Sequence, residues 1–191
     1  MSAAGGGTAA YARAIADGAD FVVGPLGRDE VSALFQQPEL ATPMLVLNRG
    51  TVAPPDGKAG LSLAPEDEVL EVGTGSGFVT ACLAALARDV VSIDRHSDFI
   101  ERTRSRLVAE GITNVRLECA DVFEWQPGRL FDAICVTGAL ALDPERFGAW
   151  LKPGGRLFVI HGQSPVQEAL RITRRGDGFH RESLFETDVP Y

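Results

Sequence analysis

The sequence predicts an α/β protein with a mostly parallel sheet, a C-terminal antiparallel hairpin and a small additional α/β segment at the N-terminus. From residue 66 onward, short apolar runs alternate with helical stretches, which is typical of right-handed βαβ units. After His161 the alternation stops, and two strand-like runs flank the glycine-rich turn at residues 174–178. A glycine-rich loop follows the first apolar run, where doubly wound sheets bind ligands.

The composition is that of a globular protein, with 191 residues, 45% hydrophobic and 23% charged. A net charge of −8 disfavours nucleic acid as a partner, because phosphate contacts need clustered Lys and Arg. We expect Cys82, Cys119 and Cys135 to be reduced core thiols, since they lie in apolar contexts without metal-ligand spacing. The sequence has no run of about 18 apolar residues and no secretion signal at its start, which predicts a cytoplasmic protein without membrane contact.

The N-terminal region predicts a small α-β-α-β unit over residues 1–50, followed by a proline-rich linker over residues 51–65. Gly18 is expected to end its first helix and Pro38 to follow its second. The predicted helices span residues 9–17 and 28–37, and the predicted strands span residues 21–24 and 43–48.

The main domain, residues 66–191, is predicted to alternate strands and helices. Ser97 is a plausible N-cap of one helix, and Gly111 is its expected stop. The predicted strands span residues 69–72, 90–94, 115–119, 131–136 and 156–161, and the hairpin strands span 169–173 and 183–187. The predicted helices span residues 77–88, 97–110 and about 144–150.

The strongest local signal is residues 69–78, Val-Leu-Glu-Val-Gly-Thr-Gly-Ser-Gly-Phe. Gly73 and Gly75 allow a tight turn and a close approach of the backbone to a ligand, because they have no Cβ. Gly77 is expected to let the next helix pack close to the strand. The chemistry of the ligand depends on what surrounds these three glycines.

A dinucleotide fingerprint has the spacing G-x-G-x-x-G, but here Phe78 stands where the third glycine would fall. Glu71, just before the loop, would repel a pyrophosphate. It suits the ammonium group of S-adenosylmethionine (SAM), directly or through water. The sequence therefore predicts a Rossmann-like sheet of the class I SAM methyltransferase type, with a dinucleotide site and a purely structural turn as alternatives.

Two further carboxylates lie at strand ends. Asp94 is placed to accept hydrogen bonds from both ribose hydroxyls, and Asp121, next to the backbone of Val122, is placed to contact an adenine amino group. Helix capping and an ordinary turn are their respective alternatives. Thr137 is expected to line the cleft near the methyl group. The complete predicted cofactor-binding set is Glu71, Gly73, Thr74, Gly75, Gly77, Asp94, Arg95, Asp121, Val122 and Thr137.

No catalytic residue and no metal site is assigned. His96, His161 and His180 are far apart in the sequence, and we expect each to be a surface or supporting residue. The sequence contains no G-x-S-x-G elbow and no Walker A loop, so it offers no sign of a serine hydrolase or a P-loop nucleotidase.

Residues 66–191 resemble the protein-L-isoaspartate O-methyltransferase family. The segments that carry the resemblance are residues 69–77, 111–115, 131–138, 151–158 and 184–187. The resemblance implies SAM as cofactor, a protein or peptide with an isoaspartyl residue as methyl acceptor, and a role in protein repair. An ionised carboxylate acceptor needs little base catalysis, so proximity and orientation would supply most of the rate.

The N-terminal region departs from that family, whose members carry a Gly-Gln-Thr-Ile-Ser-like motif before the first core strand. Residues 19–26 and 43–49 instead resemble a fragment of the lipoproteins that activate penicillin-binding proteins. Two alternatives therefore stand beside the methyltransferase: a SAM-binding module without catalysis, and a cell-wall regulatory protein, which would require secretion.

Overall fold

The computed structural model describes residues 6–19, 22–37, 40–42, 44–48, 50–52 and 61–189. The expected strand residues Phe21 and Pro43 and the linker prolines Pro54 and Pro55 lie outside these ranges. Within them, no helix is long and apolar enough to cross a membrane.

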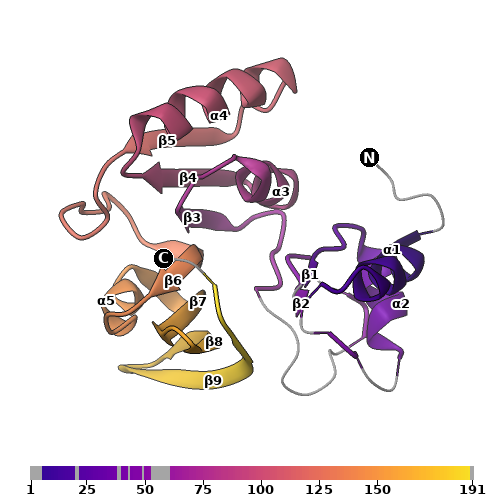
Figure 1. The fold of residues 1–191 in the computed structure, drawn as a ribbon. Coiled ribbons are helices and arrows are strands. Elements are labelled where there is room, and N and C mark those ends of the chain that lie inside the picture. The colour runs from indigo at the N-terminus through magenta and orange to yellow at the C-terminus, as the bar shows by residue number, and fades with distance from the viewer. Residues whose placement is uncertain are drawn as a thin grey trace.

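A seven-stranded sheet forms the body of the protein, in the order β5-β4-β3-β6-β7-β8-β9 (Figure 1). The first five of these strands are parallel, and β8 and β9 run antiparallel to their neighbours. The predicted fold class is therefore confirmed. The strands are β3 (Glu68–Val72), β4 (Asp89–Asp94), β5 (Val115–Cys119), β6 (Phe131–Leu140), β7 (Leu151–Gln163), β8 (Val166–Arg175) and β9 (Gly178–Thr187).

The C-terminal half contains more strand than predicted. β7 begins at Leu151 instead of Arg156, because Leu151 pairs with Phe131 before a register shift in the ladder. A second hairpin, between β7 and β8, turns at Ser164 and Pro165 and was not anticipated. The predicted hairpin is present as β8 and β9, joined at Gly176 and Asp177.

Three helices accompany the sheet: α3 (Phe78–Leu86), α4 (Ser97–Ala109) and α5 (Glu145–Gly148). α5 is shorter than the predicted helix. α3 lies over one face, where Val69, Leu83 and Phe158 share a buried cluster. α5 covers the other face, where Phe147 and Trp150 join a second cluster. Apolar side chains therefore cover both faces of the central strands, as a parallel sheet requires.

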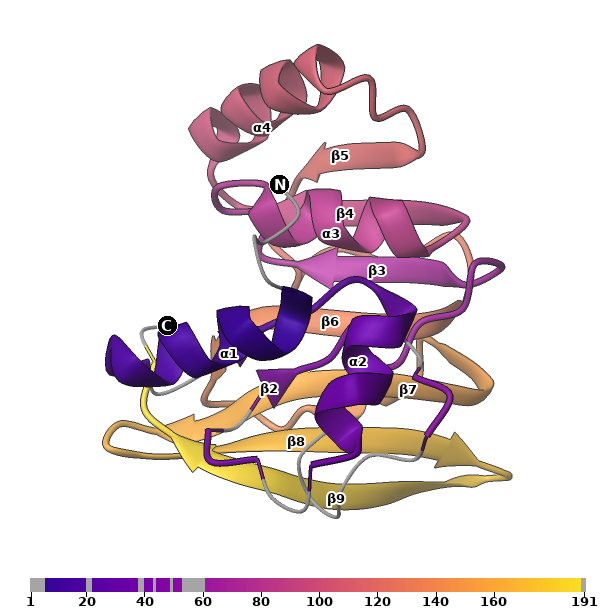
Figure 2. The same ribbon diagram turned by 90° about the vertical axis from the view of Figure 1, so that its right-hand side faces the viewer.

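The N-terminal unit packs on the same face as α3 (Figure 2). Tyr11, Leu34 and Met44 belong to a cluster of its own, whereas Leu45 and Leu47 are buried in the cluster beneath α3. The unit is therefore joined to the sheet by apolar contact. Its elements are α1 (Gly6–Ala16), β1 (Val22–Val23), α2 (Arg28–Phe35) and β2 (Met44–Leu45), with β1 and β2 parallel.

The end of the expected linker is part of the core. Leu61 and Leu63 are buried with the sheet, and the Arg156 guanidinium donates hydrogen bonds to the carbonyls of Leu61 (2.6 Å) and Ser62 (2.5 Å). The same guanidinium forms an ion pair with Asp67 at 2.5 Å. A partly buried arginine thus fixes the entry of the chain into β3.

The cysteines differ from one another. Cys82 and Cys135 are buried as predicted, but Cys119 is exposed, so its assignment to the core was wrong. Cys119 is the last residue of β5, an edge strand with a half-exposed burial pattern. An apolar run at a sheet edge does not guarantee burial on both faces.

An ion-pair network joins the amino ends of the parallel strands. Glu68, at the start of β3, lies 2.6 Å from Arg88, 2.9 Å from Arg129 and 2.6 Å from Lys152. Lys152 also reaches Asp132 at 2.8 Å. These charges hold together the edge of the sheet that lies away from the glycine loop.

Candidate functional site

A cleft of about 670 Å³ opens at the carboxyl ends of β3, β4, β5 and β6. Seven of the ten predicted binding residues line it, and they come from four separate segments of the chain. They are Gly73, Gly75, Asp94, Arg95, Asp121, Val122 and Thr137. Glu71, Thr74 and Gly77 do not line it.

The loop between β3 and α3 has all three of its glycines at positive φ: Gly73 at 98°, Gly75 at 50° and Gly77 at 79°. A Cβ on Gly73 would lie 2.4 Å from Thr137 Oγ1, so glycine allows the loop to touch β6. A Cβ on Gly75 would meet nothing within 4 Å. Gly75 therefore presents open backbone at the wall of the cleft.

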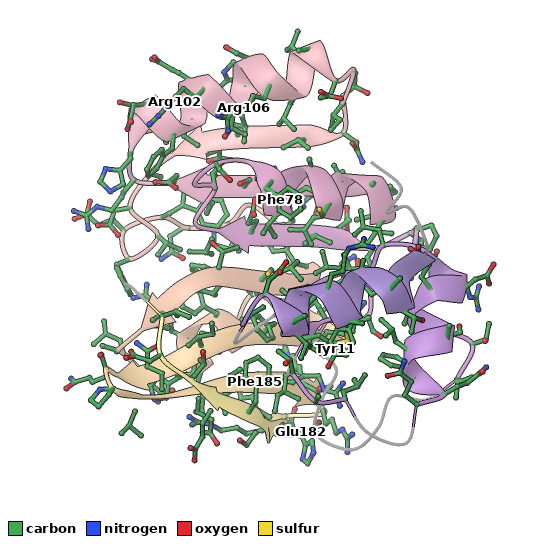
Figure 3. The ribbon with its side chains drawn as sticks, turned by 45° about the vertical axis from the view of Figure 1, so that its right-hand side comes forward. Tyr11, Phe78, Arg102, Arg106, Glu182 and Phe185 are labelled. Atoms are coloured by element: carbon green, nitrogen blue, oxygen red, sulfur yellow. The ribbon has the colours of Figure 1, made fainter. Side chains whose placement is uncertain are left out.

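Gly77 has a different role from the one expected. A Cβ there would lie 2.6 Å from Thr103 Cγ2, so glycine allows close contact with α4 rather than with the strand. The Arg106 guanidinium on α4 donates a hydrogen bond to Ser76 O at 2.6 Å, which connects α4 to the solvent-exposed side of the loop. Figure 3 shows Arg102 and Arg106 on α4 and Phe78 at the start of α3.

The N–H groups of the three loop glycines already donate within the protein. Gly73 N donates to Ile93 O at 2.8 Å and Gly77 N donates to Thr74 O at 2.9 Å, while Gly75 N donates to Asp94 Oδ2 at 2.9 Å. A phosphate-binding loop needs such groups free to face the anion. This arrangement disfavours the dinucleotide alternative.

Asp94 joins the loop to the helix that follows β4. Its Oδ2 accepts from Gly75 N, and its Oδ1 accepts from His96 N at 2.9 Å. The side chain is nearly buried yet lines the cleft. Each carboxylate oxygen keeps a free lone pair, so Asp94 can accept two further hydrogen bonds from a bound diol.

Asp121 lies two residues beyond the end of β5 rather than on it. Its Oδ1 accepts from Phe123 N at 2.9 Å, which is the arrangement of a turn-forming Asp. The residue is exposed and lines the cleft beside Val122. Asp121 therefore stabilises the turn through Oδ1, and its Oδ2 remains available to a ligand.

Glu71 lies beneath the loop, facing α3, and is fully buried. Thr80 Oγ1 and Ser92 Oγ donate to its Oε2 at 2.5 and 2.6 Å. Burial raises the pKa of Glu71 to about 7, against the effect of these two hydrogen bonds. The structure thus separates Glu71 from the cleft wall, and any effect on a ligand must pass through the loop.

Sequence reasoning missed the aromatic walls of the cleft. Phe99, in the first turn of α4, and Phe123, after β5, both line the cleft, as does His96. The guanidinium of Arg146 lies 4.9 Å from the ring centre of Phe123 and supports that wall. The available signal was position, because Phe99 follows Asp94 and Phe123 follows Asp121 within a few residues.

The two other histidines lie apart from the loop. His161 Nδ1 lies 3.0 Å from Leu140 O, in contact with a residue of the cleft wall. His180 is exposed on β9. His96 is exposed as well, although it lines the cleft.

A sequence profile of the family Protein-L-isoaspartate(D-aspartate) O-methyltransferase (PCMT) matches residues 58–188. The chain belongs to this family. The match begins near the buried residues Leu61 and Leu63 and includes the whole seven-stranded sheet.

Curated relatives agree with that assignment. The chain is 38% identical to a protein-L-isoaspartate O-methyltransferase of Dictyoglomus thermophilum over 65% of this chain and 57% of the relative. It is 44% identical to one of Methylorubrum extorquens over 61% of this chain and 51% of the relative. The chain thus spans about half to three-fifths of the length of these relatives.

Solved structures show the same fold. A protein-L-isoaspartate O-methyltransferase is 27% identical, with a TM-score of 0.61, over 67% of this chain and 42% of that one. A putative enzyme of this name from Plasmodium falciparum, solved with S-adenosyl-L-homocysteine (SAH), is 21% identical with a TM-score of 0.58 over 66% of each chain. The second likeness concerns the fold alone.

Proposed function

We propose that this protein is a SAM-dependent methyltransferase that esterifies the carboxylate of an isoaspartyl residue in a protein or peptide. Membership of the family supports the reaction class. The observation that carries the proposal is the cleft, in which Gly75 offers open backbone beside the Asp94 carboxylate.

The residues of the cleft fit SAM. Asp94 would accept hydrogen bonds from the ribose hydroxyls, and Asp121 with the backbone of Val122 would meet the adenine edge. Phe99 and Phe123 supply aromatic surface for the nucleoside. Bound there, SAM would supply an electrophilic methyl group on a positively charged sulfur.

The chain's own residues contribute mainly position and exclusion of water. Thr137 Oγ1 donates to Gly73 O at 2.6 Å and connects β6 to the loop. Residues 138–142 extend this side of the cleft with small and apolar side chains. An acceptor carboxylate entering here would lose water, which makes it a stronger nucleophile.

Methyl transfer needs no general base in this scheme. An isoaspartyl carboxylate is ionised at neutral pH, and its oxygen displaces the sulfur as the new C–O bond forms. The product pair is the neutral methyl ester and SAH. The rate would come from holding the carboxylate oxygen in line with the methyl group.

The proposal is tested by calorimetric titration with SAM, followed by methyl transfer to an isoaspartyl peptide. The matched control peptide carries an ordinary aspartyl residue at the same position. Binding together with selective methylation of the isoaspartyl peptide would support the proposal. An equal rate on both peptides would refute the isoaspartyl specificity.

A second candidate is a SAM-binding module without catalysis. The observation that favours it is the N-terminal unit, which occupies residues 6–48 and lies outside the match to the family profile. SAM binding without methylation of any isoaspartyl peptide would establish this alternative. The cleft residues would then have the same binding roles.

A further inference from the structure

A buried chain of hydrogen bonds runs beneath the glycine loop. Ser92 Oγ donates to Glu71 Oε2 at 2.6 Å, and Thr74 Oγ1 lies 2.6 Å from Ser92 Oγ. Ser92 has one hydroxyl proton and gives it to Glu71, so Thr74 must donate to Ser92. We call Thr74, Ser92 and Glu71 the Glu71 relay; it connects a buried carboxylate on β3 to the loop that forms the cleft wall.

Glu71 is held in an unusual state. Its Oε1 is buried and has no hydrogen-bond partner among the described residues. The ionisable groups that interact electrostatically with Glu71 lie on three elements: Asp94 on β4, whose charge acts on Glu71, and Cys82 on α3 and Cys135 on β6, on which Glu71 acts. Burial raises the pKa of both thiols, so they stay neutral, and Asp94 disfavours a second negative charge.

We propose that Glu71 is a positioning residue whose proton controls the affinity of the cleft for SAM, by setting the direction of the hydrogen bonds in the Glu71 relay. The inference rests on the proposed function. It assigns to Glu71 an action through Ser92 and Thr74 on the loop, without contact with the ligand.

The physical reason is the change of a hydrogen-bond acceptor into a donor. Ionised Glu71 accepts from Ser92, which leaves Ser92 free to accept from Thr74 and so hold the loop. A proton on Oε2 would reverse these two bonds, and a proton on Oε1 would leave a buried donor without a partner. When Glu71 is protonated, the Thr74 hydroxyl therefore has a different hydrogen-bond arrangement, and the conformation of the loop that carries Thr74 changes with it.

Both states are populated near neutrality, because burial raises the pKa of Glu71 to about 7. By linkage, SAM that binds the ionised state lowers the pKa of Glu71. If only that state binds, the Kd for SAM is about tenfold higher at pH 6 than at pH 8.

The first measurement needs no ligand. Infrared difference spectroscopy of the free protein between pH 5 and pH 9 should show a buried carboxyl group that loses its proton near pH 7. The same band should be missing in Glu71→Gln. A wild-type spectrum without such a band would overturn the proposal.

The second measurement is the Kd for SAM across the same pH range. The wild type should lose about tenfold in affinity between pH 8 and pH 6, whereas Glu71→Gln should lose much less. The amino group of SAM also titrates in this range, but it is the same ligand for both proteins and cancels in the comparison. Parallel curves for the two proteins would contradict the role of Glu71.

Two variants separate the relay from a direct charge effect. Thr80→Val removes a donor to Glu71 but leaves Ser92 and Thr74 in place, so the midpoint should move to higher pH with the dependence retained. Ser92→Ala breaks the relay, so the affinity should become nearly independent of pH although the Glu71 band still titrates. A pH dependence that persists in Ser92→Ala would overturn the relay.

The outcome also separates this inference from the proposed function. If SAM binds with a Kd that does not change with pH, the inference fails and the proposed function stands. If SAM binds at no pH, both fail. Thermal unfolding of each variant by circular dichroism identifies any variant that does not fold.

Discussion

The two edges of the parallel sheet use carboxylates in opposite ways. At the amino edge, Glu68 and Asp132 are paired with Lys152 and with arginine side chains. At the carboxyl edge, Asp94 and Asp121 instead accept hydrogen bonds from backbone N–H groups and keep free lone pairs. Carboxylates paired with cations stabilise the fold, whereas those held only by backbone N–H groups remain available to a ligand.

The pKa values follow the same division. At the amino edge, a hydrogen bond from Lys152 lowers the pKa of Glu68. Burial would raise the pKa of Asp132, but hydrogen bonds from Lys152 and the backbone of Glu68 lower it overall. Beneath the carboxyl edge, burial raises the pKa of Glu71. The amino edge therefore favours charge, and the core beneath the loop disfavours it.

The largest effect should come from Gly75→Val, which places a branched side chain at positive φ in the wall of the cleft. We expect SAM affinity to fall by more than about 100-fold, with roughly 1–2 kcal/mol of backbone strain. Gly154 is the matched control, since it also has positive φ (77°) and a Cβ there would meet nothing within 4 Å. It lies near the start of β7, at the amino edge of the sheet and away from the cleft. Gly154→Val should keep its SAM affinity. Equal loss in both variants would contradict the placement of the cleft.

Replacing Glu71 should change how stability depends on pH. Because its folded pKa is raised from 4.5 to about 7, its stabilising contribution is complete below pH 4.5 and is lost as the pH rises to about 7. Glu71→Gln should remove a fall of roughly 2–3 kcal/mol in the free energy of unfolding between pH 5 and pH 8. Urea unfolding at the two pH values measures this change.

Glu68, which begins the same strand, provides the comparison for Glu71. Its pKa is lowered, so its contribution is present above the unfolded value near 4.5 and is lost as the pH falls through the lower folded value. Glu68→Gln should destabilise the protein at neutral pH and have little effect in acid. The same sign of change in both variants would show that the two environments are not opposed.

Asp94→Ala should weaken SAM binding by about 1–3 kcal/mol, because the ribose hydroxyls and the Gly75 N–H lose their acceptor. The opposite end of the same strand supplies the control, since Asp89 begins β4 and pairs with Arg129. Asp89→Ala should leave the affinity for SAM unchanged. Calorimetric titration of the three proteins gives the comparison, and unaltered binding in Asp94→Ala would show that the ribose lies elsewhere.

The smallest effect is expected for Lys152→Met, which leaves Glu68 and Asp132 without one cation. The lysine is about one-third exposed, so we expect a loss of only about 1 kcal/mol at neutral pH. The loss should shrink at high salt, which screens the pair. A measurable change in SAM affinity would mean that the two edges are coupled.

Much of the fold could be predicted because the sequence alternates apolar runs and helices so regularly. The strands that begin with Val69, Val90 and Val115 were found within one residue of their observed starts. The extension of β7 back to Leu151 was not foreseen, because residues 152–155 carry two glycines and a proline that read as a turn. Pairing with Phe131 on β6 outweighed that local preference.

The site was predicted from positions along strands, and this worked where a residue lies at or near the carboxyl end of a strand. Asp94 is the last residue of β4 and Thr137 lies in the second half of β6, and both line the cleft. Glu71 has the opposite orientation, since alternate residues of β3 face α3, and spacing alone gave no sign that it would be sealed beneath the loop. The hydroxyls of Ser92 and Thr80, which donate hydrogen bonds to Glu71, come from β4 and α3, so only the tertiary structure brings these groups together.

The most direct test is calorimetric titration of the purified protein with SAH and, separately, with NADH. We expect SAH to bind at one site, with an affinity that Asp94→Ala weakens and Asp89→Ala does not. Uptake of NADH with no binding of SAH would contradict the assignment of the cleft to SAM.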